Sequence, residues 1–270
     1  MVCMATDGAM SVEGGNWRIF EGMVEASGAV RALGTKVGQV SRKEEGGFEI
    51  MAGPAGSHGP GEVWTAEFDE VVLAAPYQFA GIEWRDVLDH TPDAIPYVDL
   101  HVTLFTSRHR LDPAAFGLKT DEQVPRMLLT TTPLAVGCNR QPDFLSISLL
   151  KEVHNRDSRR TEYAYKIFSM QPIDDSFFRR VLGLAEEGHG EAIDTEDISW
   201  IYRKLWQSYP YELPRVTFER IKLGDKVWYT SGIESLISTM ETSSLMGMNV
   251  ARLMVDEWTK AEEATLSVYS

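Results

Sequence analysis

Cysteine is almost absent from this chain of 270 residues, which contains only Cys3 and Cys138. Two cysteines so far apart exclude a disulfide framework and the closely spaced pairs of a structural zinc site. The six histidines form no H-E-x-x-H pair and no other paired metal-ligand spacing. The sequence therefore predicts no metal site.

Long apolar runs and positive charge are also scarce. No segment approaches the roughly 20 apolar residues of a transmembrane helix. The first ten residues lack the basic start and the apolar stretch of a signal peptide. The net charge is −14, from 40 acidic and 26 basic residues. Because a nucleic-acid surface needs clustered Lys and Arg, this balance argues against a nucleic-acid partner.

Several motifs of catalysis and cofactor binding are missing. There is no G-x-G-x-x-G dinucleotide fingerprint, no G-x-S-x-G nucleophile elbow and no recognisable Cys/His pair. Gly14-Gly15 by itself indicates a turn. The carboxylate pairs Asp174-Asp175 and Glu186-Glu187 are better explained by helix capping and solvation than by acid–base catalysis. The catalytic residues stay unknown at this stage.

The patterns that are present divide the chain into three parts. The first part mixes one amphipathic helix with buried strands, at residues 17–26, 34–42, 47–51 and 68–75. The middle is rich in strand patterns, at residues 97–105, 127–132, 144–150, 163–169 and 199–208, the last a strand or a short helix. A helix over residues 174–184 interrupts them, and 208–216 is an extended, proline-punctuated connector.

The third part returns to a strand at residues 226–229, a turn at Ser231-Gly232 and a helix from Met240 onward. Ser238 and Glu241 form an S-x-x-E pattern, which predicts a capping box. Small residues on one helical face, such as Gly247, predict close packing on a sheet or a ligand. The free N–H groups of such a helix start favour anionic or electron-rich ligand atoms.

This order predicts an α/β (α+β) fold in which one domain interrupts another. We expect a partial domain over residues 1–79, an inserted mixed-sheet domain over 80–220, and a returning strand and helix over 221–262.

A few side chains are candidates for ligand contacts. His101 lies in a predicted strand, where a lone histidine is more often a hydrogen-bonded core or cleft residue than a catalyst. An aromatic cluster is explained either by core packing or by the wall of an apolar ligand pocket, and it comprises Trp200, Tyr202, Trp206, Tyr209 and Tyr211. Glu241 is explained by capping, whereas Glu234 has a weaker structural reason.

Several of these segments together resemble the prenylcysteine oxidase (prenylcysteine lyase) family of FAD-dependent thioether oxidases. The matching segments occur in family order as VEGGN (12–16), FDEVVLAAP (68–76), YVDLHVTLF (97–105), YKIFS (165–169) and WYTSGIESLISTMETS (228–243) with its following helix. The last segment is fairly specific to the family, and the resemblance covers roughly residues 11–258.

The resemblance implies a Rossmann-type domain that holds FAD and a second domain that covers the flavin. Val37 corresponds to the strand position near adenine. The end of the strand that passes the cofactor corresponds to Ala74, Ala75 and Pro76. The turn near the pyrophosphate and the ribityl chain corresponds to Gly232, Ile233 and Glu234. The helix start that faces the flavin corresponds to Thr239, Met240 and Glu241. His101, Trp206 and Tyr209 are the substrate-binding candidates.

The family reaction is implied in the same way. A hydride passes from the prenyl carbon next to sulfur to the flavin, and water adds to the resulting thiocarbenium ion. A prenyl aldehyde and free cysteine are released, and oxygen reoxidises the flavin to give hydrogen peroxide. The resemblance also suggests a lysosome- or vacuole-like location, or the secretory pathway.

The missing G-x-G-x-x-G is the main departure from the family pattern. It leads us to expect a truncated chain that binds FAD weakly or not at all alone. Two alternatives stay open. One is a non-catalytic protein that binds a prenyl or other lipid chain, and the other is a related FAD oxidase of another apolar metabolite.

Overall fold

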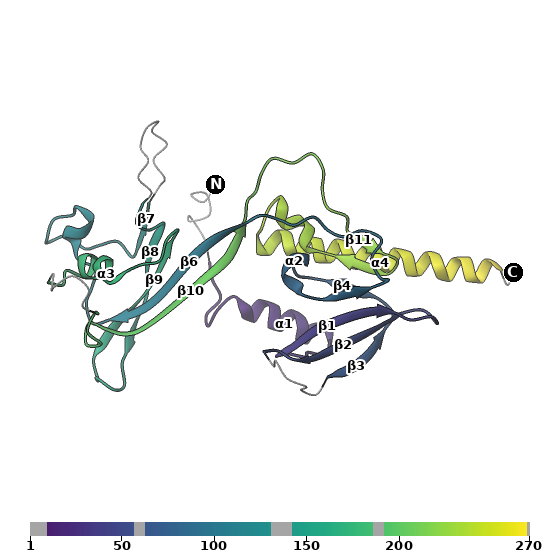
Figure 1. Ribbon diagram of the computed structural model, residues 1–270, viewed down its shortest axis with the longest axis horizontal. Coiled ribbons are helices and arrows are strands. Elements are labelled where there is room, and N and C mark those ends of the chain that lie inside the picture. Colours follow the sequence, from purple (N-terminus) through teal and green to yellow (C-terminus); the bar gives the residue numbers. More distant parts are fainter. Residues whose placement is uncertain (1–9, 57–62, 131–141, 186–191, 269–270) are drawn as a thin grey trace. The chain divides into compact units, whose positions relative to one another are not determined.

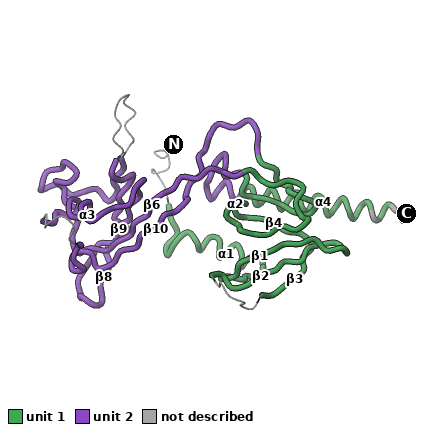
Figure 2. Tube along the Cα trace, viewed as in Figure 1, with its two compact units in different colours: residues 1–93, 219–232, 245–270 green, residues 94–218, 233–244 purple. Residues whose placement is uncertain are grey.

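A computed structural model describes residues 10–56, 63–130, 142–185 and 192–268. Cys3 and Cys138 lie outside the described residues. The chain forms two compact units (Figure 2). Unit 1 consists of residues 1–93, 219–232 and 245–270, and unit 2 of residues 94–218 and 233–244.

Unit 1 contains two small sheets (Figure 1). One has the order β3-β2-β1-β5, from β1 (Thr35–Arg42), β2 (Phe48–Pro54), β3 (Trp64–Phe68) and β5 (Glu83–Arg85). The other has the order β11-β12-β4, from β4 (Val71–Leu73), β11 (Lys222–Gly224) and β12 (Val227–Tyr229). Strands from both sheets supply one core, which includes Val40, Phe48, Leu73, Leu223 and Val227.

The predicted single strand over residues 68–75 is wrong, because the chain changes sheets there. β3 ends at Phe68 in one sheet, and β4 begins at Val71 in the other. The polar pair Asp69-Glu70 forms the connection, and the Val71 N–H donates to the Lys226 carbonyl at 3.1 Å. A continuous apolar pattern does not reveal such a change of sheet, since both halves are strand.

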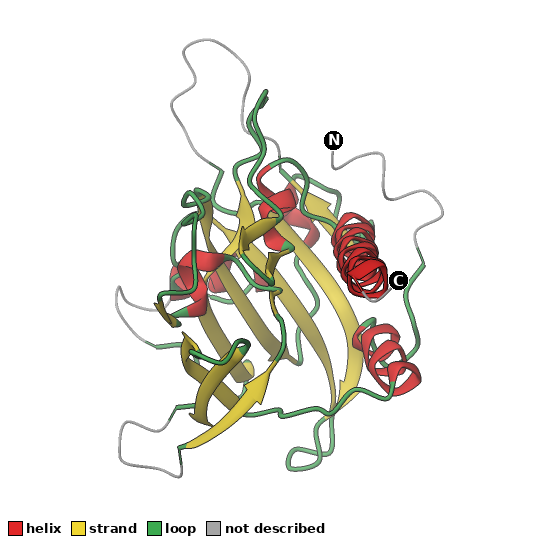
Figure 3. Cartoon of the chain, turned by 90° about the vertical axis from the view of Figure 1, so that its right-hand side faces the viewer, coloured by secondary structure: helices red, strands yellow, loops and turns green. Residues whose placement is uncertain are grey.

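Unit 2 is built around a five-stranded antiparallel sheet (Figure 3). Its order is β10-β6-β9-β8-β7, from β6 (Tyr97–Ser107), β7 (Met127–Leu129), β8 (Ser146–His154), β9 (Thr161–Ser169) and β10 (Ile198–Pro210). Alternate residues of β6, such as Thr103 and Phe105, are buried, which is the period expected of a sheet with one covered face.

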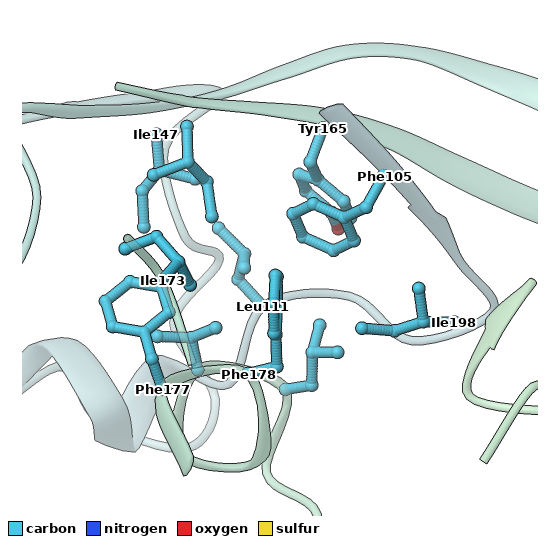
Figure 4. Packing of buried hydrophobic residues seen from close by; sticks show 11 residues of the cluster. Phe105, Leu111, Ile147, Tyr165, Ile173, Phe177, Phe178 and Ile198 are labelled. Atoms are coloured by element: carbon cyan, nitrogen blue, oxygen red, sulfur yellow. The ribbon is translucent and has the colours of Figure 1, made fainter. Parts of the chain in front are cut away.

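Helix α3 (Asp175–Leu182) covers that face. The Asp174 carboxylate caps it by accepting from the Phe177 N–H at 2.9 Å, and Gly183 ends it at a φ of 65°. The Phe178 ring packs edge-on against Phe105, with ring centroids 5.0 Å apart. Figure 4 shows this core, to which Ile147 and Tyr165 also belong. The sheet contributes to this core from only one of its faces.

The remaining helical segments are short except for α4. They are α1 (Trp17–Ser27), α2 (Tyr77–Ala80), η2 (Pro113–Phe116), η3 (Ser231–Ser235) and α4 (Met240–Val268). The predicted α+β fold class is confirmed. No helix within the described ranges has the length and apolarity needed to cross a membrane.

Two predictions about α4 are wrong. Its N-terminus is capped by Thr239, whose hydroxyl accepts from the Thr242 N–H at 3.1 Å, and not by the predicted Ser238. Packing of the small-residue row on a sheet is also wrong, because a Cβ added at Gly247 meets nothing within 4 Å. Its packing on a ligand stays a prediction. The buried side of the helix carries Val250 instead, which is 2% exposed.

Candidate functional site

The carboxyl ends of β4 and β12 lie side by side in unit 1. The two strands are parallel, with Leu73 opposite Tyr229. The Thr230 N–H donates to the Leu73 carbonyl at 3.1 Å, so the pairing extends one step beyond β12. In open α/β sheets, ligands bind outside the carboxyl ends of parallel strands. This edge is therefore a suitable place for a ligand on geometric grounds.

Small residues follow β4 at this edge. Ala74 is exposed, and Ala75 and Pro76 are half-buried. Ala75 and Val37, from the other sheet, both pack against the core of unit 1, so the fold brings these two candidates around one cluster. Methyl side chains leave the main chain accessible at Ala74. These residues fit a cofactor that is held through backbone contacts.

Gly232 has a structural reason to be glycine. A Cβ added there would lie 2.8 Å from the Glu219 Cβ and 3.4 Å from the Tyr229 ring. Burial opposes ionisation of Glu219, but the N–H groups of Arg220 and Asp93 and the His90 ring outweigh it and lower its pKa. The close packing of this loop is therefore sufficient to explain the glycine without a ligand.

The other cofactor candidates belong to unit 2. Ile233 and Glu234 lie in η3, and Met240 and Glu241 begin α4 after the Thr239 cap. The ten candidates are thus divided between the two units, with the change falling between Gly232 and Ile233.

Glu234 has a partner that sequence reasoning missed. Its Oε2 accepts a hydrogen bond from the Tyr97 hydroxyl at 2.5 Å. Tyr97 begins β6 and lies 137 positions away along the chain, so no local pattern signals the contact. The bond gives Glu234 a structural role in unit 2.

The substrate candidates lie on the pair of strands β6 and β10. Trp206 lies opposite Leu100, and Tyr209 lies opposite Val98 after a bulge between Gln207 and Tyr209. Residues paired across antiparallel strands point to the same face. The register therefore places Trp206 and Tyr209 on one face of the sheet.

His101 points to the opposite face. It lies opposite Leu205 on β10 and Ser169 on β9. The alternation along β6 separates its side chain from those of Leu100 and Val102. The structure thus brings together Trp206 and Tyr209, but not His101.

The face with Trp206 and Tyr209 is apolar and has no core of its own. We call it the open face, and by register it carries Val98, Leu100, Val102, Leu104, Thr106, Met127, Leu129, Ser146, Ser148, Lys151, Val153, Glu162, Ala164, Lys166, Phe168, Trp200, Tyr202, Lys204, Trp206 and Tyr209. None of these side chains belongs to the core of unit 2. Trp206 is 48% exposed and Tyr209 is 54% exposed.

These exposures bear on one of the two explanations of the aromatic cluster, and the ligand-pocket explanation stays a prediction. Core packing within unit 2 is wrong for Trp200, Tyr202 and Trp206, because each is about half exposed. Trp200 and Tyr202 instead stack on one another at the surface, with ring centroids 6.4 Å apart. The alternation of Trp200, Tyr202, Lys204 and Trp206 is the sequence pattern that could have predicted their position on one face of a strand.

Two further features of unit 2 lie away from the open face. A cavity of about 390 Å³ is lined by residues that include Leu111, Val124, Leu149 and Tyr165. Burial raises the pKa of Tyr165 to about 12, and its hydroxyl donates to the His109 carbonyl at 3.3 Å. Within the described residues, no group of three or more His, Cys, Asp or Glu side chains could hold a metal ion.

Residues 1–266 match the family model described as Prenylcysteine lyase. The chain therefore belongs to the prenylcysteine lyase family, as its sequence segments had indicated.

Curated relatives have the same kind of name. The chain is 28% identical over 264 residues to "Farnesylcysteine lyase" of Arabidopsis thaliana, covering 96% of this chain and 45% of that protein. It is 26% identical over 277 residues to "Prenylcysteine oxidase 1" of Rattus norvegicus, and the match covers 94% of this chain and 48% of that protein. The Homo sapiens protein of that name is 24% identical over 280 residues, and the match covers 93% of this chain and 48% of that protein. The chain spans about half the length of these relatives.

Proposed function

We propose that this chain is the substrate-binding part, with a portion of the cofactor domain, of an FAD-dependent oxidase that cleaves the thioether of prenylated cysteine. The overall reaction converts the thioether, oxygen and water into a prenyl aldehyde, free cysteine and hydrogen peroxide. The open face is the observation that carries this proposal, because it offers a half-exposed apolar and aromatic surface in a chain of this family.

The open face suits a prenyl chain on physical grounds. Trp206 and Tyr209 present large, rigid surfaces, and Leu100 and Val98 lie opposite them on β6. Burying apolar surface releases free energy at about 25 cal/mol per Å². A prenyl chain held there excludes water from the carbon next to its sulfur.

The cofactor part of the proposal is supported by the edge beyond β4 and β12. FAD, when bound, supplies the hydride acceptor for the carbon next to sulfur. Ala74, Ala75 and Pro76 would hold it through main-chain contacts, together with Val37 and Gly232 from unit 1. From unit 2, Ile233, Glu234, Thr239, Met240 and Glu241 would contribute the turn and the helix start. His101, the third substrate candidate, lies on the opposite face of the sheet and would not contact a prenyl chain on the open face.

Turnover by the full chain tests the proposal. The chain is incubated with added FAD and S-farnesyl-L-cysteine, and hydrogen peroxide, aldehyde and free thiol are measured, while bound ligand is measured separately. We expect farnesylcysteine to bind and, to the extent that FAD binds, the three products to form in equal amounts. Binding of both farnesylcysteine and FAD without products supports the alternative of a non-catalytic prenyl-binding protein, and absence of farnesylcysteine binding contradicts both.

A pair of matched variants locates the binding surface. Trp206→Ser removes an exposed indole from the open face, and Trp17→Ser removes one that is 56% exposed on α1 of unit 1. We expect the first change to weaken farnesylcysteine binding about tenfold, or ~1.4 kcal/mol. The second should leave affinity unchanged. Equal effects would contradict the assignment of the open face.

A further inference from the structure

The open face carries three lysines, Lys151, Lys166 and Lys204, and the last two contact its aromatic rings. Lys204 lies on β10 between Tyr202 and Trp206, and its Nζ is 4.7 Å from the centre of the Trp206 ring. Lys166 lies on β9, and its Nζ is 4.5 Å from the centre of the Phe168 ring. Both ammonium groups therefore rest against aromatic surface.

The register places these lysines around the same short piece of β6. Lys204 lies opposite Val102, and Lys166 lies opposite Leu104. Because alternate residues share a face, Val102 and Leu104 are neighbours on the open face. Lys204 and Lys166 thus lie on the two strands that flank this apolar strip of β6.

Neither lysine forms an ion pair with a carboxylate of the described residues. Glu162 is the one carboxylate that the described strands place on this face, and it is 5% exposed. Its oxygens already accept from the Asn155 amide at 2.7 Å and from the Ser199 hydroxyl. The open face is therefore locally positive in a chain with a net charge of −14.

This arrangement matches an amphiphile with an apolar chain and an anionic head. An ammonium ion beside aromatic rings is partly removed from water, which strengthens its attraction to an anion. A carboxylate can accept hydrogen bonds from two ammonium groups at once. The apolar strip between the lysines provides contact for the chain of the same molecule.

We propose that Lys166 and Lys204 bind the α-carboxylate of a prenylated amino acid whose chain lies on the open face. The inference rests on the proposed function for the presence of a prenyl ligand. It adds a selection rule, since a ligand whose carboxyl group is esterified or in a peptide bond lacks the charge that the lysines recognise. Free prenylcysteine is then preferred over its ester and over a cysteine inside a peptide.

Binding of two matched ligands tests the rule without any variant. The full chain is titrated with S-farnesyl-L-cysteine and with its methyl ester, which share the prenyl chain and differ in charge. We expect the acid to bind about tenfold more tightly, as for one charge-assisted hydrogen bond. Equal binding would overturn the role of the lysines and leave the apolar site intact. Binding of neither ligand would contradict the proposed function itself.

Variants assign the preference to the two lysines. Lys166→Met and Lys204→Met keep most of the side-chain length and remove the charge. Each should reduce the preference for the acid while leaving ester affinity unchanged. Lys119→Met is the control, because Lys119 is an exposed lysine of unit 2 outside the open face. A preference that survives in both single variants and in the double variant would overturn the assignment.

A lipid surface is the competing source of an anionic amphiphile. Sedimentation with phosphatidylserine vesicles and with phosphatidylcholine vesicles separates the two. Binding to the anionic vesicles that depends on both lysines, together with equal affinity for acid and ester, would overturn the proposal and assign the face to a membrane.

Discussion

At the scale of single residues, burial controls the chemistry of Tyr165. Its side chain is 2% exposed, and its ring stacks on Phe105 with centroids 5.0 Å apart. Burial disfavours the phenolate, and the pKa of Tyr165 is therefore raised from 10.0 to about 12. A tyrosine in this position is a neutral hydrogen-bond donor over the whole physiological range.

The raised pKa predicts a loss of stability at alkaline pH. Between pH 10 and about 12 the unfolded chain loses the Tyr165 proton while the folded chain keeps it. The unfolded state then binds fewer protons, so the free energy of unfolding falls as pH rises. We expect Tyr165→Phe to flatten this fall, measured by urea unfolding across the window. Tyr202→Phe, at an exposed site, should keep the original slope, and equal slopes in all three proteins would contradict the prediction.

At the scale of elements, Glu70 holds the long helix α4 to the small sheet of unit 1. One of its carboxylate oxygens accepts from the Trp228 indole at 2.7 Å, and the other accepts from the Trp258 indole. Trp228 lies on β12 and is 2% exposed, and Trp258 lies on α4. Lys222 on β11 also forms an ion pair with Glu257 on α4, with its Nζ 2.6 Å from the Glu257 carboxylate.

Removal of this carboxylate should loosen α4. Glu70→Ala leaves the buried Trp228 indole without an acceptor, which costs about 1–3 kcal/mol of the free energy of unfolding. Glu70→Gln keeps one acceptor oxygen and should cost less. The control is Glu67→Ala, which removes the exposed ion-pair partner of Lys43 and should cost less than Glu70→Ala. A Glu70→Ala cost no greater than that of Glu67→Ala in urea unfolding would contradict the anchor.

At the scale of the whole molecule, the chain has two separate hydrophobic cores. The core of unit 1 is formed by residues such as Val40 and Leu223, and the core of unit 2 by residues such as Ile167 and Phe178. The chain enters unit 2 after Asp93 and returns at Glu219, so unit 2 is inserted within unit 1. Each core can in principle be lost independently of the other.

Two large-to-small substitutions test this independence. Phe178→Ala and Leu223→Ala each empty a fully buried position, in unit 2 and unit 1 respectively. We expect losses of about 3–5 and 2–5 kcal/mol, and each should displace a different calorimetric unfolding transition. If both variants shift one shared transition equally, the two cores unfold together and the prediction is wrong.

Local elements followed directly from local patterns. The Asp174 cap and the Phe177, Phe178, Val181 spacing predict α3, and the alternation over residues 97–105 predicts β6. The helix at α1 was equally readable from its period. These features are decided by interactions among residues close in the chain, which is why the sequence alone contains them.

The candidate site depends on contacts between distant residues. The bulge before Tyr209 determines that it shares a face with Trp206, and the pairing of β6 with β9 brings Lys166 to that face. The Tyr97–Glu234 bond joins residues 137 positions apart. A shift of one residue in register would invert every such assignment. Composition, local periodicity and the family segments thus determined the class of fold and the family, whereas only the tertiary structure decided which side chains meet, because register and packing bring together residues that the sequence keeps apart.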